Sequence, residues 1–294
     1  MSSVPRQFPF WKMHGAGNDF VVVETDILDV SDAEWGALAV EVCDRHMGVG
    51  ADGLILVQPS TVADRKMRIF NADGSDGVMC VNGIRCFAKF SIDRGLVDAP
   101  EGRMTVETGP GIMPVHATRA EDGTVARVQV TAAVPDLDPA ASGVSIEQPA
   151  PVLDLPVTTT DAQGASTQHV AIVSMGNPHA VQFIDVAPED FPLTRIGPQM
   201  EHHALFTQRT NYEVTRVLDR SHMEMRVWER GVGETMACGS GACAVVVAAR
   251  LRGEVDDRVD VRLPGGTLEI EWNGHDAVSL TGPAVRVFES EWTR

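Results

Sequence analysis

The stretch Met67–Gly83, MRIFNADGSDGVMCVNG, returns in altered form at Met225–Gly241, MRVWERGVGETMACGSG. Aligned without gaps, the two segments share their methionine, the arginine after it, one cysteine and the final glycine. The shared cysteines are Cys80 and Cys238, 158 positions apart. This internal repeat indicates that the chain contains the same structural unit twice.

A second pair of motifs lies at almost the same spacing. Gly17–Phe20 (GNDF) corresponds to Gly176–His179 (GNPH), 159 positions later, and an apolar run follows each. Two matches at one spacing favour a single duplicated lobe over a solenoid of short repeats. We therefore expect an α+β protein of two pseudo-symmetric lobes.

Local patterns predict the elements of these lobes. His222–Trp228 (HMEMRVW) alternates apolar and polar residues, which is typical of a half-buried strand. Glycines predict where helices end. The predicted helices are Ala33–Arg45 after Ser31 and Asp32, Val81–Arg94 before Gly95, and Gly239–Arg252 before Gly253. Further strands are predicted at Gly53–Val57, Val125–Val130, Val259–Leu263, Thr267–Trp272 and Ala284–Phe288.

The last predicted helix has an interior, ACAVVVAARL, that is apolar nearly all round. Such a helix belongs at the centre of a lobe, despite the modest helix propensity of valine. We expect each lobe to wrap a curved, mostly antiparallel sheet around one buried helix, with the active site in the cleft between the lobes. The Pro-, Ser- and Thr-rich segment Val134–Gln168 predicts an extended hairpin or loop region. The expected domains are residues 1–127 plus 282–294, whose tail adds a strand, and residues 128–281.

The composition and net charge argue against several classes of protein. The 294 residues are 44% hydrophobic and 22% charged, as in a soluble globular protein, with no apolar run of membrane-spanning length. The first residues, MSSVPRQFPFWK, lack the features of a secretory signal, so we expect a cytoplasmic protein. A formal charge of −17 without a dense basic cluster argues against nucleic acid or an anionic membrane as a partner. A small-molecule substrate stays compatible with it.

The cysteines number five, which is odd, and a reducing compartment is expected, so a structural disulfide framework is not indicated. They include no C-x-x-C pair, so a structural zinc site is not indicated either. No other metal site and no pyridoxal phosphate site is indicated either, so we expect no cofactor. We interpret Cys43, Cys86 and Cys243 as small buried hydrophobes. Taken alone, Cys80 could be a nucleophile, an acid/base group, a metal ligand, half of a disulfide or a packing residue.

The repeat favours acid/base chemistry. Cys80 and Cys238 each lie at the start of a predicted buried helix, where unpaired N–H groups and the helix dipole lower the pKa of a thiol and bind anions. Two such lobes would place one thiol on each face of the α-carbon of a small carboxylate. One thiolate would remove the α-proton and the other thiol would deliver one, which is racemisation or epimerisation.

The chain resembles the diaminopimelate epimerases along nearly its whole length. The motifs that carry the resemblance are KMHGAGNDFVVVE, DRHMGVGADGLI, MRIFNADGSDGVMCVNGIRCFAKF, SMGNPHAVQF, RTNYEV, RVWERGVGETMACGSGACA, LPGGTLEIEW and LTGPA. The resemblance implies the two-lobed fold and a cofactor-independent isomerase that interconverts LL- and meso-diaminopimelate in lysine biosynthesis. Members of this family can pair as homodimers.

The resemblance also implies roles for individual residues. Cys80 and Cys238 match the two-base pair, and His179 and Glu229 match positions that assist catalysis. The reacting carboxylate would bind backbone N–H groups of Val81, Asn82, Gly239 and Ser240. The distal amino-acid end of the substrate would bind Asn18, Asn71, Asn177, Asn211 and Arg230, with Glu229 near its ammonium.

Three positions depart from the usual pattern of the family. The family usually has EMCGNG or QMCGNG where this chain has VMCVNG, so Val78 replaces a polar side chain and Val81 a glycine. The Val81 N–H can serve the carboxylate site only if its φ is negative. Gly53 stands where some members carry glutamine. Two alternatives therefore stay open: a pyridoxal-independent racemase of another amino acid, and a catalytically silent ligand-binding relative.

Overall fold

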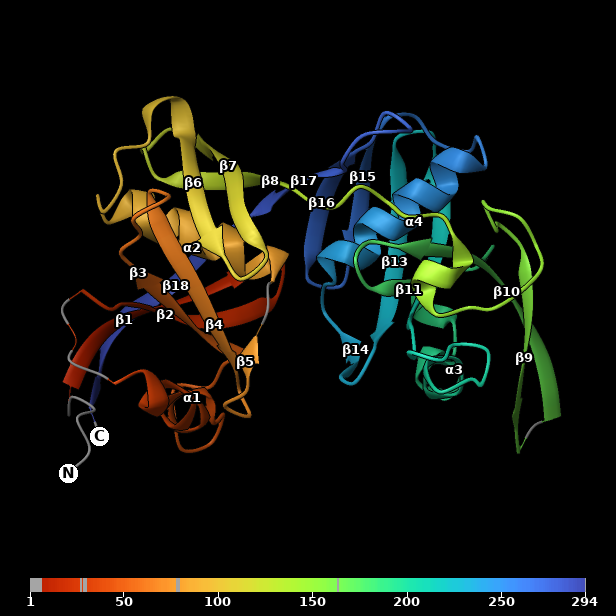
Figure 1. Ribbon diagram of the computed structural model, residues 1–294, viewed down its shortest axis with the longest axis horizontal. Helices are drawn as coiled ribbons and strands as arrows, with labels where there is room; N and C mark the ends of the chain where they lie inside the picture. Colours follow the sequence, from red (N-terminus) through yellow and green to blue (C-terminus); the bar gives the residue numbers. More distant parts are fainter. Residues whose placement is uncertain (1–6, 27, 29–30, 78–79, 163, 294) are drawn as a thin grey trace. The chain divides into compact units, whose positions relative to one another are not determined.

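The computed structural model describes residues 7–26, 28, 31–77, 80–162 and 164–293, so Val78 lies outside the described residues. The chain divides into two compact units, Met1–Val130 with Thr281–Arg294, and Thr131–Leu280. Both units are mainly strands with few helices (Figure 1), which confirms the expected α+β class. Within the described residues, no helix is both long and apolar enough to cross a membrane.

The strands of the first unit are mostly antiparallel. They are β1 (Gln7–Gly15), β2 (Asn18–Glu24), β3 (Gly53–Gln58), β4 (Arg65–Asn71), β5 (Asp76–Gly77), β6 (Arg103–Thr108), β7 (Gly111–Arg119), β8 (Val125–Thr131) and β18 (Val285–Thr293). Strand β1 pairs with β2 and with β18, so the C-terminal tail adds a strand to this unit, as expected. Only β2–β3 and β4–β6 are parallel among the pairs described within this unit.

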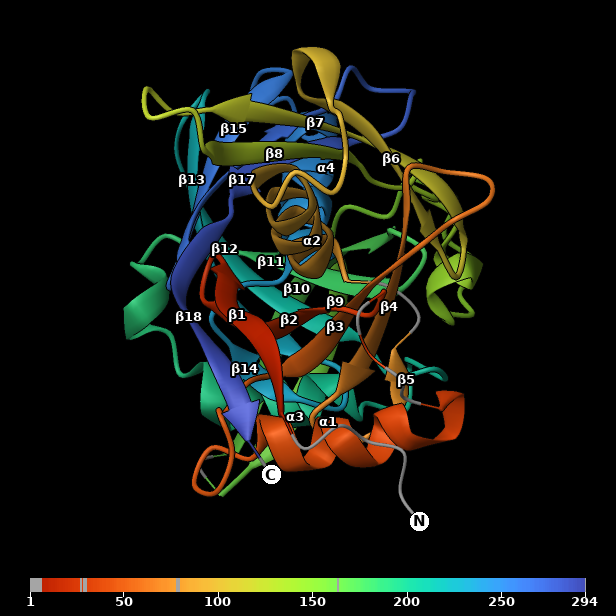
Figure 2. The same cartoon turned by 90° about the vertical axis from the view of Figure 1, so that its left-hand side faces the viewer.

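Strand alternation divides the core of the first unit into two parts. On β3, Ile55 and Val57 pack towards helix α2 (Val81–Asp93), whereas Leu54 and Leu56 pack towards helix α1 (Trp35–Cys43). Figure 2 shows strands β1 to β4 between these two helices. Because successive side chains of a strand point to opposite faces, a continuous apolar run can cover both helices.

The second unit repeats this arrangement. Its strands are β9 (Leu155–Asp161), β10 (Gly164–Ser174), β11 (Pro178–Phe183), β12 (Asn211–Asp219), β13 (His222–Glu229), β14 (Gly233–Thr235), β15 (Arg258–Leu263) and β16 (Gly266–Glu271); β17 (Ser279–Pro283) crosses the boundary between the units. Its parallel pairs, β11–β12 and β13–β15, take the places of β2–β3 and β4–β6. Its helices are α3 (Leu193–Glu201) and α4 (Gly239–Leu251).

Helix α4 is buried as its apolar sequence predicted. Val245, Val246 and Val247 are each completely buried. Burying a valine side chain contributes about 1.5 kcal/mol or more, which exceeds a helix-propensity cost of roughly 0.6 kcal/mol. The predicted ends of α2 and α4 are also confirmed, because Gly95 and Gly253 have positive φ values of 70° and 75° just past the helices.

Other predicted boundaries were less accurate. The helix predicted to Arg45 ends at Cys43, because the Asp44 carboxylate accepts hydrogen bonds from the N–H groups of His46 and Met47 and turns the chain. Helix α3 was not predicted, since it contains Pro198. Tertiary packing of its apolar face, rather than propensity, stabilises it.

The segment expected as a hairpin or loop contains one short 3-10 helix among its described residues, Pro139–Ser142, and ends in the β9–β10 hairpin.

Candidate functional site

Cys80 caps the N-terminus of α2 in the first unit. Its backbone is extended (φ −141°, ψ 115°), and its Sγ accepts a hydrogen bond of 3.4 Å from the N–H of Gly83. The half-buried thiol also lies 3.4 Å from the Asn18 Oδ1. Cys80 therefore stands where the free N–H groups of a helix begin, as its sequence context predicted.

Val81 is the first residue of α2 and has no positive φ. Its side chain packs against the apolar core of the first unit. The backbone condition for its N–H to act as a donor is therefore met, and the β-branched side chain is accommodated in the core.

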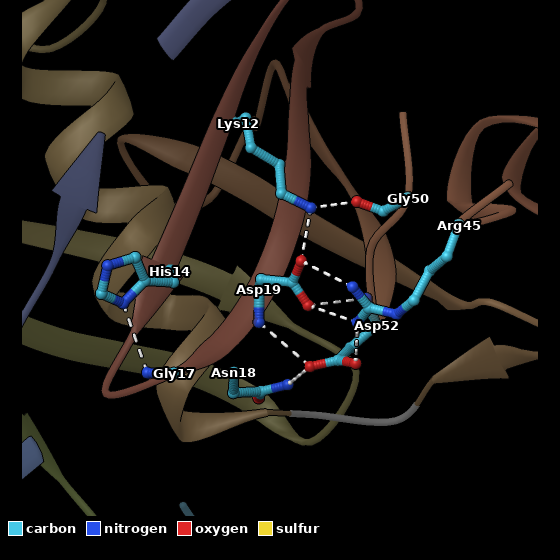
Figure 3. Close-up of polar contacts among 8 residues, drawn as sticks. All are labelled: Lys12, His14, Gly17, Asn18, Asp19, Arg45, Gly50 and Asp52. Carbon is cyan, nitrogen blue, oxygen red and sulfur yellow. Dashed lines mark hydrogen bonds and ion pairs between the residues drawn. The ribbon is translucent and has the colours of Figure 1, made fainter. Parts of the chain in front are cut away.

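Asn18 is held by a network of charged side chains, shown in Figure 3. Its Nδ2 donates to Asp52 Oδ2 at 2.7 Å, and Arg45 bridges the carboxylates of Asp52 and Asp19 at 2.7 Å each. Lys12 donates to Asp19 and to the Gly50 carbonyl. Burial opposes ionisation of Asp19, but hydrogen bonds from Arg45 and Lys12 outweigh it and lower the Asp19 pKa to about 2.

The structure connects Asn82 to this group, but not Asn71. The Asn82 Nδ2 donates to Asn18 Oδ1 at 3.4 Å. Asn71 lies exposed at the end of β4, where its Nδ2 donates to Ser75 Oγ at 2.9 Å. Its amide therefore belongs to the β4–β5 turn.

In the second unit, Cys238 caps α4 as Cys80 caps α2. Its Sγ accepts a hydrogen bond of 3.4 Å from the N–H of Gly241. The residues that follow, Gly239 and Ser240, form the first turn of the helix, and the Ser240 Oγ lies 3.5 Å from the thiol.

The prediction that a helix start lowers the thiol pKa was wrong for Cys238. Burial, together with the nearby carboxylates of Glu229 and Glu213, raises the pKa of Cys238 well above its ordinary value. Hydrogen bonds from Ser240 and Gly241 act in the opposite direction without cancelling this effect. Cys238 is therefore a neutral thiol near pH 7.

A chain of polar contacts leads from a buried glutamate to this thiol. The side chains of Glu213 and His179 are completely buried, and His179 Nδ1 lies 2.7 Å from Glu213 Oε1. His179 Nε2 lies 3.1 Å from the Asn177 Oδ1, and the Asn177 Nδ2 donates to Ser240 Oγ at 3.4 Å. These contacts align His179, Asn177 and Ser240 next to Cys238.

Glu229 is the last residue of β13, and Arg230 follows it. Burial raises the pKa of Glu229, whose carboxylate also accepts from the Thr235 hydroxyl. The Arg230 side chain donates to the Gln208 carbonyl at 3.1 Å, and its backbone N–H donates to Asn211 Oδ1 at 2.9 Å.

Asn211 itself is buried, and its Nδ2 donates to the Pro178 carbonyl at 2.8 Å. Both ends of the Asn211 amide thus fix the neighbouring backbone.

The remaining cysteines lie apart from this chemistry. Cys43, Cys86 and Cys243 are buried, and burial raises the pKa of Cys43 and of Cys86 to about 12. Among the side chains that the structure describes, no group of three or more His, Cys, Asp or Glu could hold a metal ion.

Sequence reasoning missed Asp52 and Glu213. Glu213 carried no signal of burial, because it alternates with Tyr212 and Val214 as a solvent-facing residue of a strand would. Asp52 lies in a glycine-rich loop, where an aspartate is ordinary, and only the fold brings it to Asn18.

The comparisons with known proteins agree over the length of the chain. The family model for diaminopimelate epimerase matches residues 10–134 and 171–287. A diaminopimelate epimerase of Acetivibrio thermocellus is 44% identical over 283 residues, which cover 96% of this chain and 97% of the relative. One of Moorella thermoacetica is 46% identical over 288 residues, covering 96% and 98%.

Solved structures share the fold at low sequence identity. A Bacillus anthracis phenazine biosynthesis protein of the PhzF family has a TM-score of 0.68 at 19% identity, with 98% of this chain and 99% of that chain covered. A hydroxyproline epimerase of Agrobacterium vitis also has a TM-score of 0.68, at 14% identity, with 100% and 94% covered.

Proposed function

The chain belongs to the diaminopimelate epimerase family, and from this premise we propose that it interconverts LL- and meso-diaminopimelate without a cofactor. It is then an isomerase of lysine biosynthesis. As further parts of the proposal, it acts in the cytoplasm on this small molecule, and it pairs as a homodimer as the family resemblance implies.

The observation that carries the proposal is the pair of equivalent cysteines. Cys80 and Cys238 cap corresponding helices, and each Sγ accepts from the N–H three residues later at 3.4 Å. In the proposed reaction both cysteines act on the α-carbon of one substrate molecule. The thiolate of one cysteine takes the α-proton and forms an S–H bond, while the other thiol gives its proton to the opposite face of the α-carbon.

The raised pKa of Cys238 suits the part of proton donor. A thiol must carry its proton until the carbanion forms, and the Glu229 and Glu213 carboxylates favour that protonated state. After one turnover the two cysteines have exchanged protonation states, so the enzyme is ready for the reverse reaction. Cys80 is correspondingly the first base, and its thiol must lose its own proton to solvent before the reaction begins.

The starts of the two helices provide the proposed site for the reacting carboxylate. The first N–H groups of a helix have no carbonyl partner within it, and the helix dipole favours an anion there. These N–H groups would stabilise the enolate-like charge that develops as the α-proton leaves. The residues concerned are Val81 and Asn82 on α2, and Gly239 and Ser240 on α4.

The distal amino-acid end of the substrate is assigned to amide and guanidinium groups. Arg230 is exposed, and its planar guanidinium offers five N–H donors, which suits a carboxylate. Glu229 suits the ammonium. Asn211 contributes by holding the Arg230 backbone. The remaining members of this set are Asn18, Asn71 and Asn177.

A pyridoxal-independent racemase of another amino acid is the alternative within the same chemistry. Arg230 and the asparagines favour a substrate with a second amino-acid end. The main argument for a catalytically silent binder was the valine at position 81. That argument is weakened, because Val81 has the backbone conformation that a donor N–H requires.

The test is isotope exchange. The protein is incubated with LL-diaminopimelate in D2O, and deuterium at the α-carbon is followed by NMR together with formation of the meso isomer. We expect both, and we expect neither with the Cys80→Ser, Cys238→Ser double variant. Exchange into another amino acid but not into diaminopimelate would identify the alternative racemase, and no exchange into any amino acid would overturn the proposal.

A further inference from the structure

The amide of Asn18 is held in one orientation by its surroundings. Its Nδ2 donates to Asp52 Oδ2 at 2.7 Å, whereas its Oδ1 faces the Cys80 Sγ and the Asn82 Nδ2, each at 3.4 Å. Because an ionised carboxylate only accepts hydrogen bonds, the NH2 end must face Asp52. The carbonyl end must therefore face the thiol.

Asp52 is itself fixed from two directions. Its Oδ2 also accepts from the backbone N–H of Asp19 at 3.0 Å, and its Oδ1 accepts from Arg45 at 2.7 Å. The Asp52 N–H in turn donates to Asp19 Oδ1 at 3.2 Å. Figure 3 shows Asn18 at the end of this network, which starts at Lys12.

We propose that Asp52 is a positioning residue that keeps the Asn18 carbonyl, rather than its NH2 group, directed at Cys80. Two consequences follow. The Cys80 thiol has an acceptor for its S–H, which favours the protonated form in the free protein. A substrate group that binds Asn18 Oδ1 must be a donor, such as an ammonium. The second consequence rests on the function proposed above, and the first does not.

The Asp19 carboxylate keeps its charge over the pH range in which a thiol titrates. The charged and titratable groups around Asn18 are Lys12, His14, Asp19, Arg45 and Asp52. The low pKa of Asp19, about 2, keeps it ionised. A change in Cys80 reactivity between pH 6.5 and 9 would therefore report the Asn18 hydrogen bond rather than titration of Asp19.

Two variants of Asp52 separate hydrogen bonding from charge. Asp52→Ala removes the acceptor, so the Asn18 amide can turn and the thiol loses its carbonyl partner. Asp52→Asn removes the same charge but keeps a side-chain oxygen that can accept from Asn18. Arg45 can then pair with Asp19 alone, because its side chain is exposed. Asp26→Ala is the matched control, because Asp26 pairs with Arg65 at 2.7 Å in the same unit.

The readout is alkylation of Cys80 by iodoacetamide, followed by peptide mass spectrometry at several pH values. A neutral hydrogen bond of ordinary strength corresponds to a change in rate of about three- to tenfold at pH 7. We expect the rate of Cys80 alkylation to increase by this factor in Asp52→Ala. It should change by less than about twofold in Asp52→Asn and should not change in Asp26→Ala. In a protein that already carries Asn18→Ala, adding Asp52→Ala should not change the alkylation rate further.

Equal changes in Asp52→Ala and Asp52→Asn, or a full effect of Asp52→Ala without Asn18, would show that Asp52 acts by charge and would overturn the proposal. If Asp52→Ala does not fold, NMR of the unaltered protein decides. Slow solvent exchange of the Asn18 side-chain NH2 supports the proposal, and fast exchange overturns it. None of these readouts needs turnover, so failure of the proposed function is recognised separately.

Discussion

Gly241 and Gly83 stand at equivalent places, three residues after Cys238 and Cys80, but they face different neighbours. A Cβ built on Gly241 would lie 2.8 Å from Glu213 Oε1 and 3.4 Å from the Cys238 Sγ. A Cβ on Gly83 would lie 3.1 Å from Ile55 Cδ1 and 3.2 Å from Met67 Cε, the ends of flexible side chains. The two Gly→Ala variants therefore form a matched pair.

Gly241→Ala should destabilise the protein. The new methyl group must displace the Glu213 carboxylate, which is buried and hydrogen-bonded to His179. Loss of its hydrogen bond to His179 costs about 1.5–3 kcal/mol, and the better helix propensity of alanine returns about 1 kcal/mol. We expect a net loss of about 0.5–2 kcal/mol, which lowers Tm by roughly 1–8 °C at this chain length.

Gly83→Ala should be nearly neutral. The same gain in propensity, about 1 kcal/mol, offsets the small adjustment of Ile55 and Met67. We expect a change in stability of less than about 1 kcal/mol in either direction.

Activity should separate the two variants as well. A shifted Cys238 thiol and a displaced His179 should lower kcat at least tenfold in Gly241→Ala, about 1.4 kcal/mol or more in the barrier. The kcat of Gly83→Ala should stay within about threefold of that of the unaltered protein, which corresponds to a change of about 0.7 kcal/mol in the activation barrier. The assays are thermal unfolding by circular dichroism and α-deuterium exchange. Equal effects of both substitutions would refute the assignment of Glu213 as a rigid support.

Three other predictions concern the cysteines. Cys80→Ser and Cys238→Ser should each lower turnover severely, by about a thousandfold or more on the usual scale of acid/base catalysis, and near-normal rates in either would contradict the two-base assignment. Mild oxidation should join Cys80 to Cys238 and inactivate the enzyme until reductant is added, and full activity without that crosslink in mass spectra would count against it. Burial raises the pKa of Cys43 and Cys86 from 9.0 to about 12, so the unfolded chain ionises first and urea unfolding should show stability falling from about pH 9 towards pH 12. The same slope in a Cys43→Ala, Cys86→Ala variant would exclude this cause.

Much of the fold follows from pattern alone. The repeat at 158 positions places Cys80 and Cys238 at the starts of helices with the same length, and glycines with positive φ end both helices where expected. These features depend on local backbone preferences and apolar spacing, which a sequence displays directly. Helix α3 escaped prediction because its proline argues locally against a helix that packing stabilises.

The duplication, the types of the main elements and the two cysteines at equivalent helix starts can therefore be predicted from the sequence. The groups that surround those cysteines come from distant parts of the chain and are known only from the folded structure. Glu213 lies 34 positions from His179 and Asp52 lies 34 positions from Asn18, and strand pairing brings each to its partner. The raised pKa of Cys238 arises in the same way, because burial and carboxylates from β12 and β13 outweigh the local effect of the helix start.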